Sequence, residues 1–228
     1  MHTDNKMSFG LRIISEILSY FVGLDLGQSR NHSALAVVER AELLLDEMDW
    51  VTYERRREWR YRMRFLERVP LGTPYPDVAA RVRAVVRNEA IARRCTLVMD
   101  ATGVGAPVLD LLRRAGLGCG IDGVILTGGE RESHAGGGWH VRKRDLITGL
   151  RVSLDNRELG LPANFGPTRL LIEELRGIET RMNGSGAMRV GAWREGEQDD
   201  LVMALALACW RARWKRREMF ESRSLGLG

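Results

Sequence analysis

The sequence predicts an α/β domain in which a mixed central sheet is flanked by helices. Two observations lead to this fold class. Three strand-like segments come first, at residues 20–26, 33–40 and 58–70, and after them short apolar strands alternate with amphipathic helices. The chain has 228 residues, of which 44% are hydrophobic, and this is enough for one domain with a substantial core.

The first two strands are predicted to form a hairpin. The segments YFVGLDL (20–26) and SALAVVER (33–40) are apolar and are joined by the polar turn GQSRNH. In the third segment, residues 58–70, apolar side chains alternate with arginines, which is typical of a strand with one solvated face. The alternating apolar residues are Trp59, Tyr61, Met63 and Phe65. A short helix is expected before the first strand, near residues 11–18.

The rest of the chain alternates between strand and helix patterns. Buried strands are expected at 95–103 and 123–129, and a hairpin at 179–192. Helices are expected at 76–94, 104–116, 142–156, 167–178 and 198–214. The glycine-rich segment 128–140, which carries His134 and His140, is predicted to be a surface loop.

No internal repeat divides the chain. We expect an N-terminal extension or short helix at 1–19, one domain at 20–218 and a tail at 219–228. No uninterrupted apolar segment approaches the ~20 residues of a membrane span, and the start lacks the order of a signal peptide. Three cysteines without metal-site or paired spacing suggest a reducing compartment, so we expect a cytoplasmic protein that binds no membrane.

The charge balance favours an acidic partner. The net charge is +5, and of the 35 basic residues only Lys6, Lys143 and Lys215 are lysines. Arginine suits phosphate because its guanidinium can bond two oxygens at once. A genome rich in G and C, which encodes arginine often, explains many of these residues equally well. The arginines at 55–57 and at 60, 62 and 64 therefore either follow a DNA backbone or form a solvated strand face.

Acidic residues fall at three comparable places in the predicted fold. Asp25 ends the first strand, Asp100 ends the strand TLVMD, and Asp199 and Asp200 begin the last helix. That helix is apolar on every side and must be largely buried. Since sites in such sheets gather at strand ends and in the neighbouring loops, we expect these carboxylates to meet.

Each acid also has a simpler explanation. Asp25 suits a turn, Asp100 suits an Asx-turn, and Asp199 or Asp200 suits a helix N-cap. One common cause accounts for all of them better than three separate ones. Clustered carboxylates repel one another unless a cation is present, and Mg²⁺ or Mn²⁺ prefers their hard oxygens. Two such ions about 4 Å apart can clamp the attacking and leaving oxygens in phosphodiester hydrolysis.

Four segments together resemble the nuclease domain of the large terminase subunit of tailed bacteriophages. They are FVGLDLG with its hairpin, LVMDATGVGAPVLDLL, VRKRDLITGL and EQDDLVMALALA, and they extend from about residue 20 to residue 210. The resemblance implies a ribonuclease H-like fold and an endonuclease that uses two Mg²⁺ or Mn²⁺ ions to cut double-stranded viral DNA during packaging. It also implies a separate packaging ATPase, a portal or a small terminase subunit as a partner.

The resemblance also implies roles for particular residues. Asp25 matches the metal ligand of the first strand, Asp100 the second acid, and Asp200 the acid that opens the last helix. Asp199 matches the neighbouring acid, which we count among the metal ligands. Lys143 matches a basic position near the active site, where it and its neighbours Arg142 and Arg144 would contact DNA.

The sequence departs from the family in three places. Gln198 stands where a histidine is often found, and Met203 occupies a position that carries a further acid in many relatives. The chain contains no phosphate loop of the form GxxxxGK[ST], so this chain would be an isolated nuclease domain, a fragment or a prophage remnant.

Two other functions stay open. VGLDLGQS also resembles the first phosphate loop of the actin-like ATPases and sugar kinases, although this chain is too short for two such domains. An inactive, DNA-binding remnant of a terminase is the other alternative.

Overall fold

The computed structural model describes residues 12–27, 31–127, 132–182, 188–191 and 198–224. The elements in chain order are β1 (Ile13–Asp25), β2 (Ala34–Asp49), β3 (Glu54–Arg68), α1 (Tyr75–Val86), β4 (Cys95–Asp100), α2 (Gly105–Arg114), β5 (Gly120–Thr127), β6 (Ser133–Ala135), β7 (Gly138–Arg142), α3 (Lys143–Asp155), β8 (Leu159–Gly160), α4 (Gly166–Gly177), β9 (Glu179–Met182), β10 (Met188–Gly191) and α5 (Asp200–Ser224). No helix within these ranges is long and apolar enough to cross a membrane.

The central sheet is mixed, as expected, and has the order β6-β7-β5-β4-β1-β2-β3-β8. Strands β1, β2 and β3 are antiparallel neighbours, whereas β1, β4, β5 and β7 run parallel. Because β1 and β4 are adjacent and parallel, their carboxyl ends lie at the same edge of the sheet. Strands β9 and β10 form a separate two-stranded sheet, and the turn between them lies outside the described residues.

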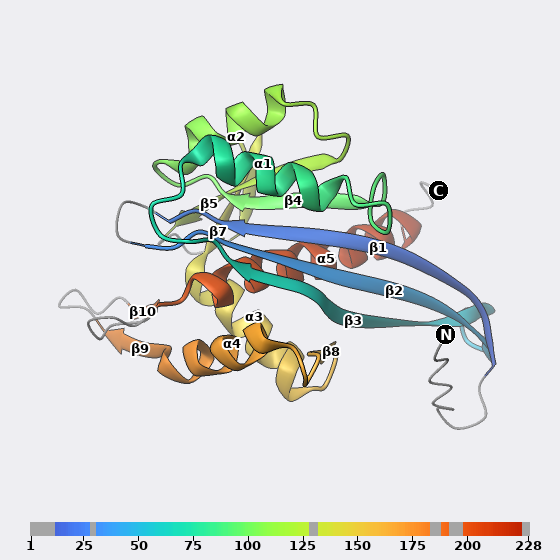
Figure 1. The fold of residues 1–228 in the computed structure, drawn as a ribbon. Helices are drawn as coiled ribbons and strands as arrows, with labels where there is room; N and C mark the ends of the chain where they lie inside the picture. The colour runs from blue at the N-terminus through green and yellow to red at the C-terminus, as the bar shows by residue number, and fades with distance from the viewer. Residues whose placement is uncertain (1–11, 28–30, 128–131, 183–187, 192–197, 225–228) are drawn as a thin grey trace.

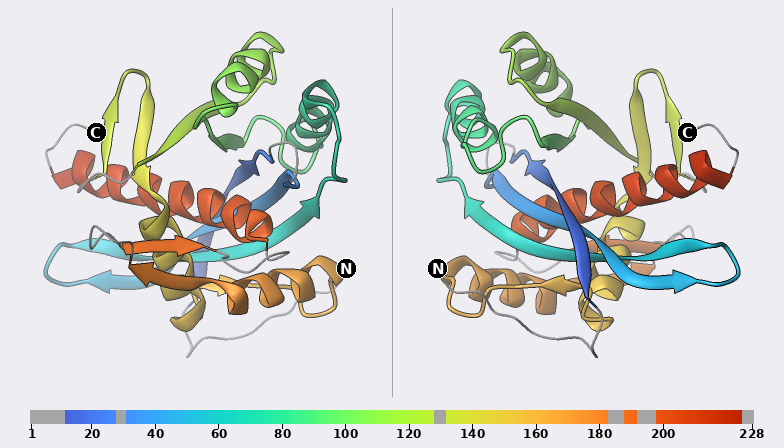
Figure 2. Two further views of the ribbon diagram at one scale, coloured as in Figure 1. Left: turned by 90° about the vertical axis from the view of Figure 1, so that its left-hand side faces the viewer. Right: turned by 90° about the vertical axis from the view of Figure 1, so that its right-hand side faces the viewer.

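Helices cover both faces of the sheet, which gives three layers (Figure 1). Helices α1 and α2 lie on one face, and α5 lies on the other with α3 and α4 beyond it (Figure 2). The alternation of side chains along β1 divides the core accordingly. Val22 and Leu24 face α1 and α2, whereas Phe21 packs in the core formed with α5.

Helix α5 is the most deeply buried helix of this core. Its residues 201 to 208 are at most 2% exposed, as the absence of a polar face in the sequence predicts. The helix approaches β1 so closely that a Cβ on Gly23 would lie 1.9 Å from the Ala204 carbonyl oxygen. Glycine at position 23 therefore sets the distance between helix and sheet.

The helix predicted near residues 11–18 is wrong. Residues from Ile13 onward belong to β1, where Ile13 to Leu18 pair with Leu45 to Ala41 of β2. Leu18 packs against Ala41, Leu43 and Leu45, so the long β2 strand provides a partner that local propensity does not reveal.

The predicted face of Phe65 is also wrong. The pairing between β2 and β3 shifts at Arg64, because Val37 pairs with Phe65 while Val38 pairs with Met63. This bulge reverses the alternation. Tyr61 and Met63 pack in the α5 core, and Phe65 packs on the opposite face with α1 and α2.

The glycine-rich segment contains a strand pair that the sequence did not reveal. Strands β6 and β7 form a hairpin at the edge of the sheet, and both His134 and His140 lie in it. Trp139 of β7 packs against Trp210 and Trp214 of α5, with ring centroids 5.5 and 4.6 Å apart. These two tryptophans therefore pack within the protein.

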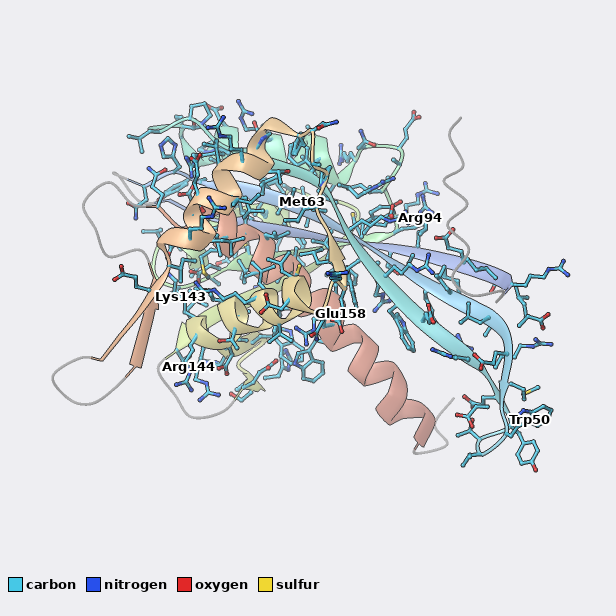
Figure 3. All side chains as sticks on the ribbon, turned by 90° about the horizontal axis from the view of Figure 1, so that it is seen from below. Trp50, Met63, Arg94, Lys143, Arg144 and Glu158 are labelled. Carbon is cyan, nitrogen blue, oxygen red and sulfur yellow. The ribbon has the colours of Figure 1, made fainter. Side chains whose placement is uncertain are left out.

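Strands β2 and β3 extend beyond the helices. The turn at the end of this ribbon carries exposed Trp50, Val51 and Tyr53, and Figure 3 shows Trp50 at its tip. The arginines of β3 are ion-paired along the ribbon: Arg55 with Asp46, Arg57 with Glu42 and Arg64 with Glu39. This favours the interpretation of β3 as a solvated strand face over that of a DNA track.

Replacing Gly23 with alanine tests the close contact between β1 and α5. We expect Gly23→Ala to destabilise the protein by about 3 kcal/mol, because a backbone carbonyl cannot move away as a side chain can. Gly120→Ala in β5 is the control, since its Cβ would lie 3.7 Å from the nearest atoms. It should change stability by less than about 1 kcal/mol in urea unfolding. Equal unfolding midpoints for the two variants would contradict the close packing.

Candidate metal centre

Asp25 and Asp100 lie at the same edge of the sheet, as the sequence predicted. Each is the last residue of its strand, and the preceding residues, Leu24 and Met99, are paired neighbours in β1 and β4. Asp100 also forms the expected Asx-turn, because its Oδ1 accepts a hydrogen bond from the Thr102 amide at 2.8 Å. The turn and the site are therefore compatible roles for the same side chain.

Asp199 joins these two acids from the start of α5. The pKa of Asp25 is well above its ordinary value, first because burial disfavours the charged form and then because Asp100 and Asp199 repel it. Asp200 contributes less to this repulsion, and Lys143 opposes it. Burial also raises the pKa of Asp100, against the Thr102 hydrogen bonds and Lys143, which lower it.

Lys143 is the basic residue of this cluster. It opens helix α3, and its Nζ donates to Asp199 Oδ2 at 2.6 Å. Gly191, at the end of β10, lies against the pair: a Cβ there would be 3.4 Å from Asp199 Oδ2 and 3.6 Å from Lys143 Nζ. The end of β1, the starts of α3 and α5, and the end of β10 therefore lie close to one another.

Arg142 and Arg144, the neighbours of Lys143, turn to a different acid. Arg142 Nε lies 2.7 Å from Asp145 Oδ2, and Arg144 Nε lies 3.7 Å from Asp145 Oδ1. Both arginines remain partly exposed. Figure 3 shows Lys143 and Arg144 at the end of the molecule opposite Trp50 and the tip of the β2–β3 ribbon.

Asp200 is buried and held by residues that the sequence analysis missed. Its Oδ2 accepts from Arg68 Nε at 2.8 Å, and Arg68 also bonds Glu174 of α4. The sequence did contain a signal for Glu174, because it follows the buried Thr168 and Leu171 at helical spacing on the apolar face of α4. Arg68, the last residue of an alternating strand, carried no such signal.

The carboxylates interact electrostatically without surrounding a single point. In the part of the chain that the structure describes, no three acidic, imidazole or thiol groups are gathered closely enough to hold a metal ion as they stand. Met203 is buried in the core at 2% exposure, so it contributes no polar group to the site. The groups that could serve as donors are the carboxylates of Asp25, Asp100, Asp199 and Asp200.

This set of donors suits a hard divalent cation. Around Asp25 lie three further carboxylates, of which Asp199 is paired with Lys143 and Asp200 with Arg68. Asp25 and Asp100 have no basic residue in direct contact among the ion pairs of the described residues. A divalent cation would supply the missing positive charge, and Mg²⁺ and Mn²⁺ prefer such oxygen ligands.

Solved nuclease structures have the same fold. The large terminase nuclease from thermophilic phage G20c matches with a TM-score of 0.59 and 21% identity, over 87% of this chain and 86% of that chain. A second structure of it, with bound magnesium, gives 0.57 and 22% over the same shares. A mutant nuclease domain of the large terminase subunit gp2 of bacterial virus Sf6, with manganese and beta-thujaplicinol, gives 0.55 and 16%, over 84% and 87%.

These matches establish the fold. The chain has the ribonuclease H-like α/β fold that the sequence predicted, and it shares this fold with large terminase nuclease domains from several phages. No family model matches the sequence, and no curated protein matches it.

The raised pKa of Asp25 predicts how stability responds to its removal. We expect Asp25→Asn to raise the melting temperature of the metal-free protein at pH 7, since it removes a charge that burial and its neighbours disfavour. The folded-state pKa lies above the unfolded one, so the penalty in the wild type is present at high pH and disappears as pH falls to about 4. The increase in melting temperature caused by Asp25→Asn should therefore disappear over the same pH interval.

Melting curves in chelator between pH 4 and pH 8 measure this effect. Asp110→Asn is the control, because Asp110 is exposed on α2. If Asp25→Asn lowers the melting temperature at pH 7, the carboxylates do not repel one another as described.

Proposed function

We propose that this protein is a metal-dependent endodeoxyribonuclease of the terminase type, which hydrolyses phosphodiester bonds in double-stranded DNA during genome packaging. The observation that carries the proposal is that Asp25 and Asp100 end the neighbouring parallel strands β1 and β4, and that Asp199, at the start of α5, is near enough to repel Asp25. The shared fold with terminase nuclease domains supports the same reaction class.

Asp25, Asp100, Asp199 and Asp200 are the residues that we propose hold two Mg²⁺ or Mn²⁺ ions. Structures of two neighbours contain magnesium and manganese, which supports these metals over softer ones. The ions would supply an activated water and positive charge for the phosphoryl oxygens. In their presence Asp25 would be ionised, because a cation reverses the repulsion that raises its pKa.

In this proposal Lys143 acts on the phosphate rather than on the water. It is near Asp25 and bonds Asp199, so an incoming phosphate would meet its ammonium group beside the acids. Arg142 and Arg144 continue this basic surface and are only partly neutralised by Asp145. We propose that these three residues contact the DNA backbone on either side of the scissile bond.

A chain of this kind would work within a larger assembly. In this proposal a packaging ATPase, a portal and a small terminase subunit are the partners, and the reaction takes place in the cytoplasm of a bacterial host. These 228 residues would cut DNA and leave translocation to an ATPase, since they contain no phosphate loop for ATP.

The alternative functions lack a comparable observation. The turn after β1, where an actin-like ATPase would bind phosphates, borders a pocket of about 260 Å³. In the described residues this pocket is lined by glycine, asparagine, serine, threonine, proline and tyrosine, without a charged group for triphosphate. A plasmid-cutting assay beside an ATP-hydrolysis assay separates the nuclease from the ATPase, and absence of both activities with DNA binding retained would identify an inactive remnant.

Plasmid nicking tests the proposed reaction directly. We expect nicking in Mg²⁺ or Mn²⁺ and none in excess chelator. Asp25→Asn should lower the rate about a thousandfold, which corresponds to ~4 kcal/mol of transition-state stabilisation. Asp110→Asn, on exposed α2, should nick at the wild-type rate. Undiminished cutting in chelator, or by Asp25→Asn, would refute the proposal.

Salt-dependent DNA binding tests the proposed contact surface. We expect Arg144→Gln to weaken binding to a duplex about fivefold at 0.1 M salt and to reduce the slope of log affinity against log salt by about one. Arg55→Gln, at the start of β3, should leave both quantities unchanged because Asp46 already neutralises Arg55 at 2.6 Å. If Arg55→Gln weakens DNA binding and Arg144→Gln does not, the DNA contacts the arginines of β3 instead.

A further inference from the structure

We propose that Arg68 and Glu174 are positioning residues that fix the acidic start of helix α5, so that Asp200 turns one oxygen toward the metal site. The inference rests on the proposed function for the metal site itself. It adds two residues that neither touch the substrate nor lie in any of the segments that carry the resemblance to terminases.

Arg68 occupies one oxygen of Asp200. Its Nε donates to Asp200 Oδ2 at 2.8 Å, and among the hydrogen bonds of the described residues none engages Oδ1. A carboxylate held by one oxygen keeps a fixed rotation about its χ angles, and the other oxygen then has a defined direction. Asp199 is held in the same way, because Lys143 bonds its Oδ2 at 2.6 Å.

Glu174 fixes Arg68 in turn. Its Oε1 accepts from Arg68 Nη2, so the guanidinium bridges two carboxylates, one from α5 and one from α4. The side chains of Glu174 and Asp200 are each only 6% exposed, whereas that of Arg68 is 23% exposed. Buried ion pairs of this kind hold a geometry firmly, since breaking one leaves an uncompensated charge away from water.

The second oxygen of Glu174 caps helix α5. Its Oε2 accepts from the amide of Val202 at 3.0 Å. Val202 lies in the first turn of α5, where amides have no partner within the helix and are usually satisfied by a side chain at the N-cap. Here the acceptor comes from another helix, which leaves the carboxylate of Asp199 to Lys143 and to the site.

Arg68 and Glu174 therefore join β3, α4 and α5 through three hydrogen bonds, two of which end on the first turn of α5. Residues that orient a ligating carboxylate typically change metal affinity 10- to 100-fold when they are replaced. Because the guanidinium has a planar fork, it can serve both acids at once, and a lysine ammonium at this position could not reproduce both bonds in the same geometry.

Metal titration without DNA tests the inference by a readout other than cleavage. We expect Arg68→Gln to bind Mn²⁺ about tenfold more weakly than the wild type in isothermal titration calorimetry. Arg64→Gln is the matched control, since Arg64 lies on the same strand and pairs with Glu39 away from the site. It should bind Mn²⁺ like the wild type. Arg68→Lys keeps the positive charge, so its Mn²⁺ affinity should lie between those of Arg68→Gln and the wild type. Arg68→Lys replaces Arg68→Gln in the comparison if the latter does not fold.

A second pair of variants tests the part played by Glu174. Glu174→Ala should weaken Mn²⁺ binding severalfold, because it frees Arg68 and removes the acceptor for Val202. Glu173→Ala is the control on the same helix, where Glu173 is 57% exposed and pairs with Arg169. Its Mn²⁺ affinity should stay at the wild-type value.

A double variant shows whether Arg68 acts through Asp200. The affinity of Arg68→Gln with Asp200→Asn should equal that of Asp200→Asn alone. Additive losses, or a lower melting temperature for Arg68→Gln and Arg68→Lys at unchanged Mn²⁺ affinity, would overturn the inference. Asp25→Asn separates a failure of the metal site from a failure of the positioning role. If Asp25→Asn binds Mn²⁺ like the wild type, the proposed metal site is refuted. If Asp25→Asn loses Mn²⁺ binding while the Arg68 variants bind normally, only the positioning role is refuted.

Discussion

Repulsion among carboxylates is the constraint on which the arrangement of this molecule depends. Asp25, Asp100 and Asp199 come from parts of the chain that are far apart in sequence, and folding brings their charges to one edge of the sheet. The surrounding structure offsets this repulsion only in part. Lys143 is bound to Asp199 and Arg68 to Asp200, while burial keeps the pKa of Asp25 well above its ordinary value. The fold therefore tolerates a local excess of negative charge that a divalent cation would relieve.

The sequence predicted the fold class, and it indicated the acids of the proposed site, because both leave local patterns. Apolar strands, helix spacing and an acid at each strand end can be seen within a window of ten residues. The roles of Arg68 and Glu174 could not be predicted in this way, because they arise from contacts between residues that are far apart in the sequence. Arg68 bonds Asp200 and Glu174, and Glu174 also accepts from the amide of Val202. Phe65 was placed on the wrong face because a bulge at Arg64, set by pairing with β2, reverses the alternation.

The basic character of the chain has less meaning for DNA binding than its net charge suggests. Most arginines of β3 with a described ion pair face an acid of β2, so this ribbon is electrostatically balanced along its length. The positive groups near the acids are fewer: Lys143 bonds Asp199, and Arg142 and Arg144 are its neighbours at the start of α3. The arginines of β3 and the basic residues near Lys143 differ in their position relative to the proposed site. Amino-acid composition does not record this difference.

The burial of α5 has a consequence for the order in which the protein matures. Helix α5 follows every other described element in the chain, yet it fills the centre of one core and packs directly on β1, the first strand. During synthesis, β1 to β10 must wait for α5 before this core can close, because contacts between such distant segments form late and slowly. Asp25 and Asp199 meet only at that moment. A nascent chain would thus be unable to bring these two carboxylates together until translation has passed α5.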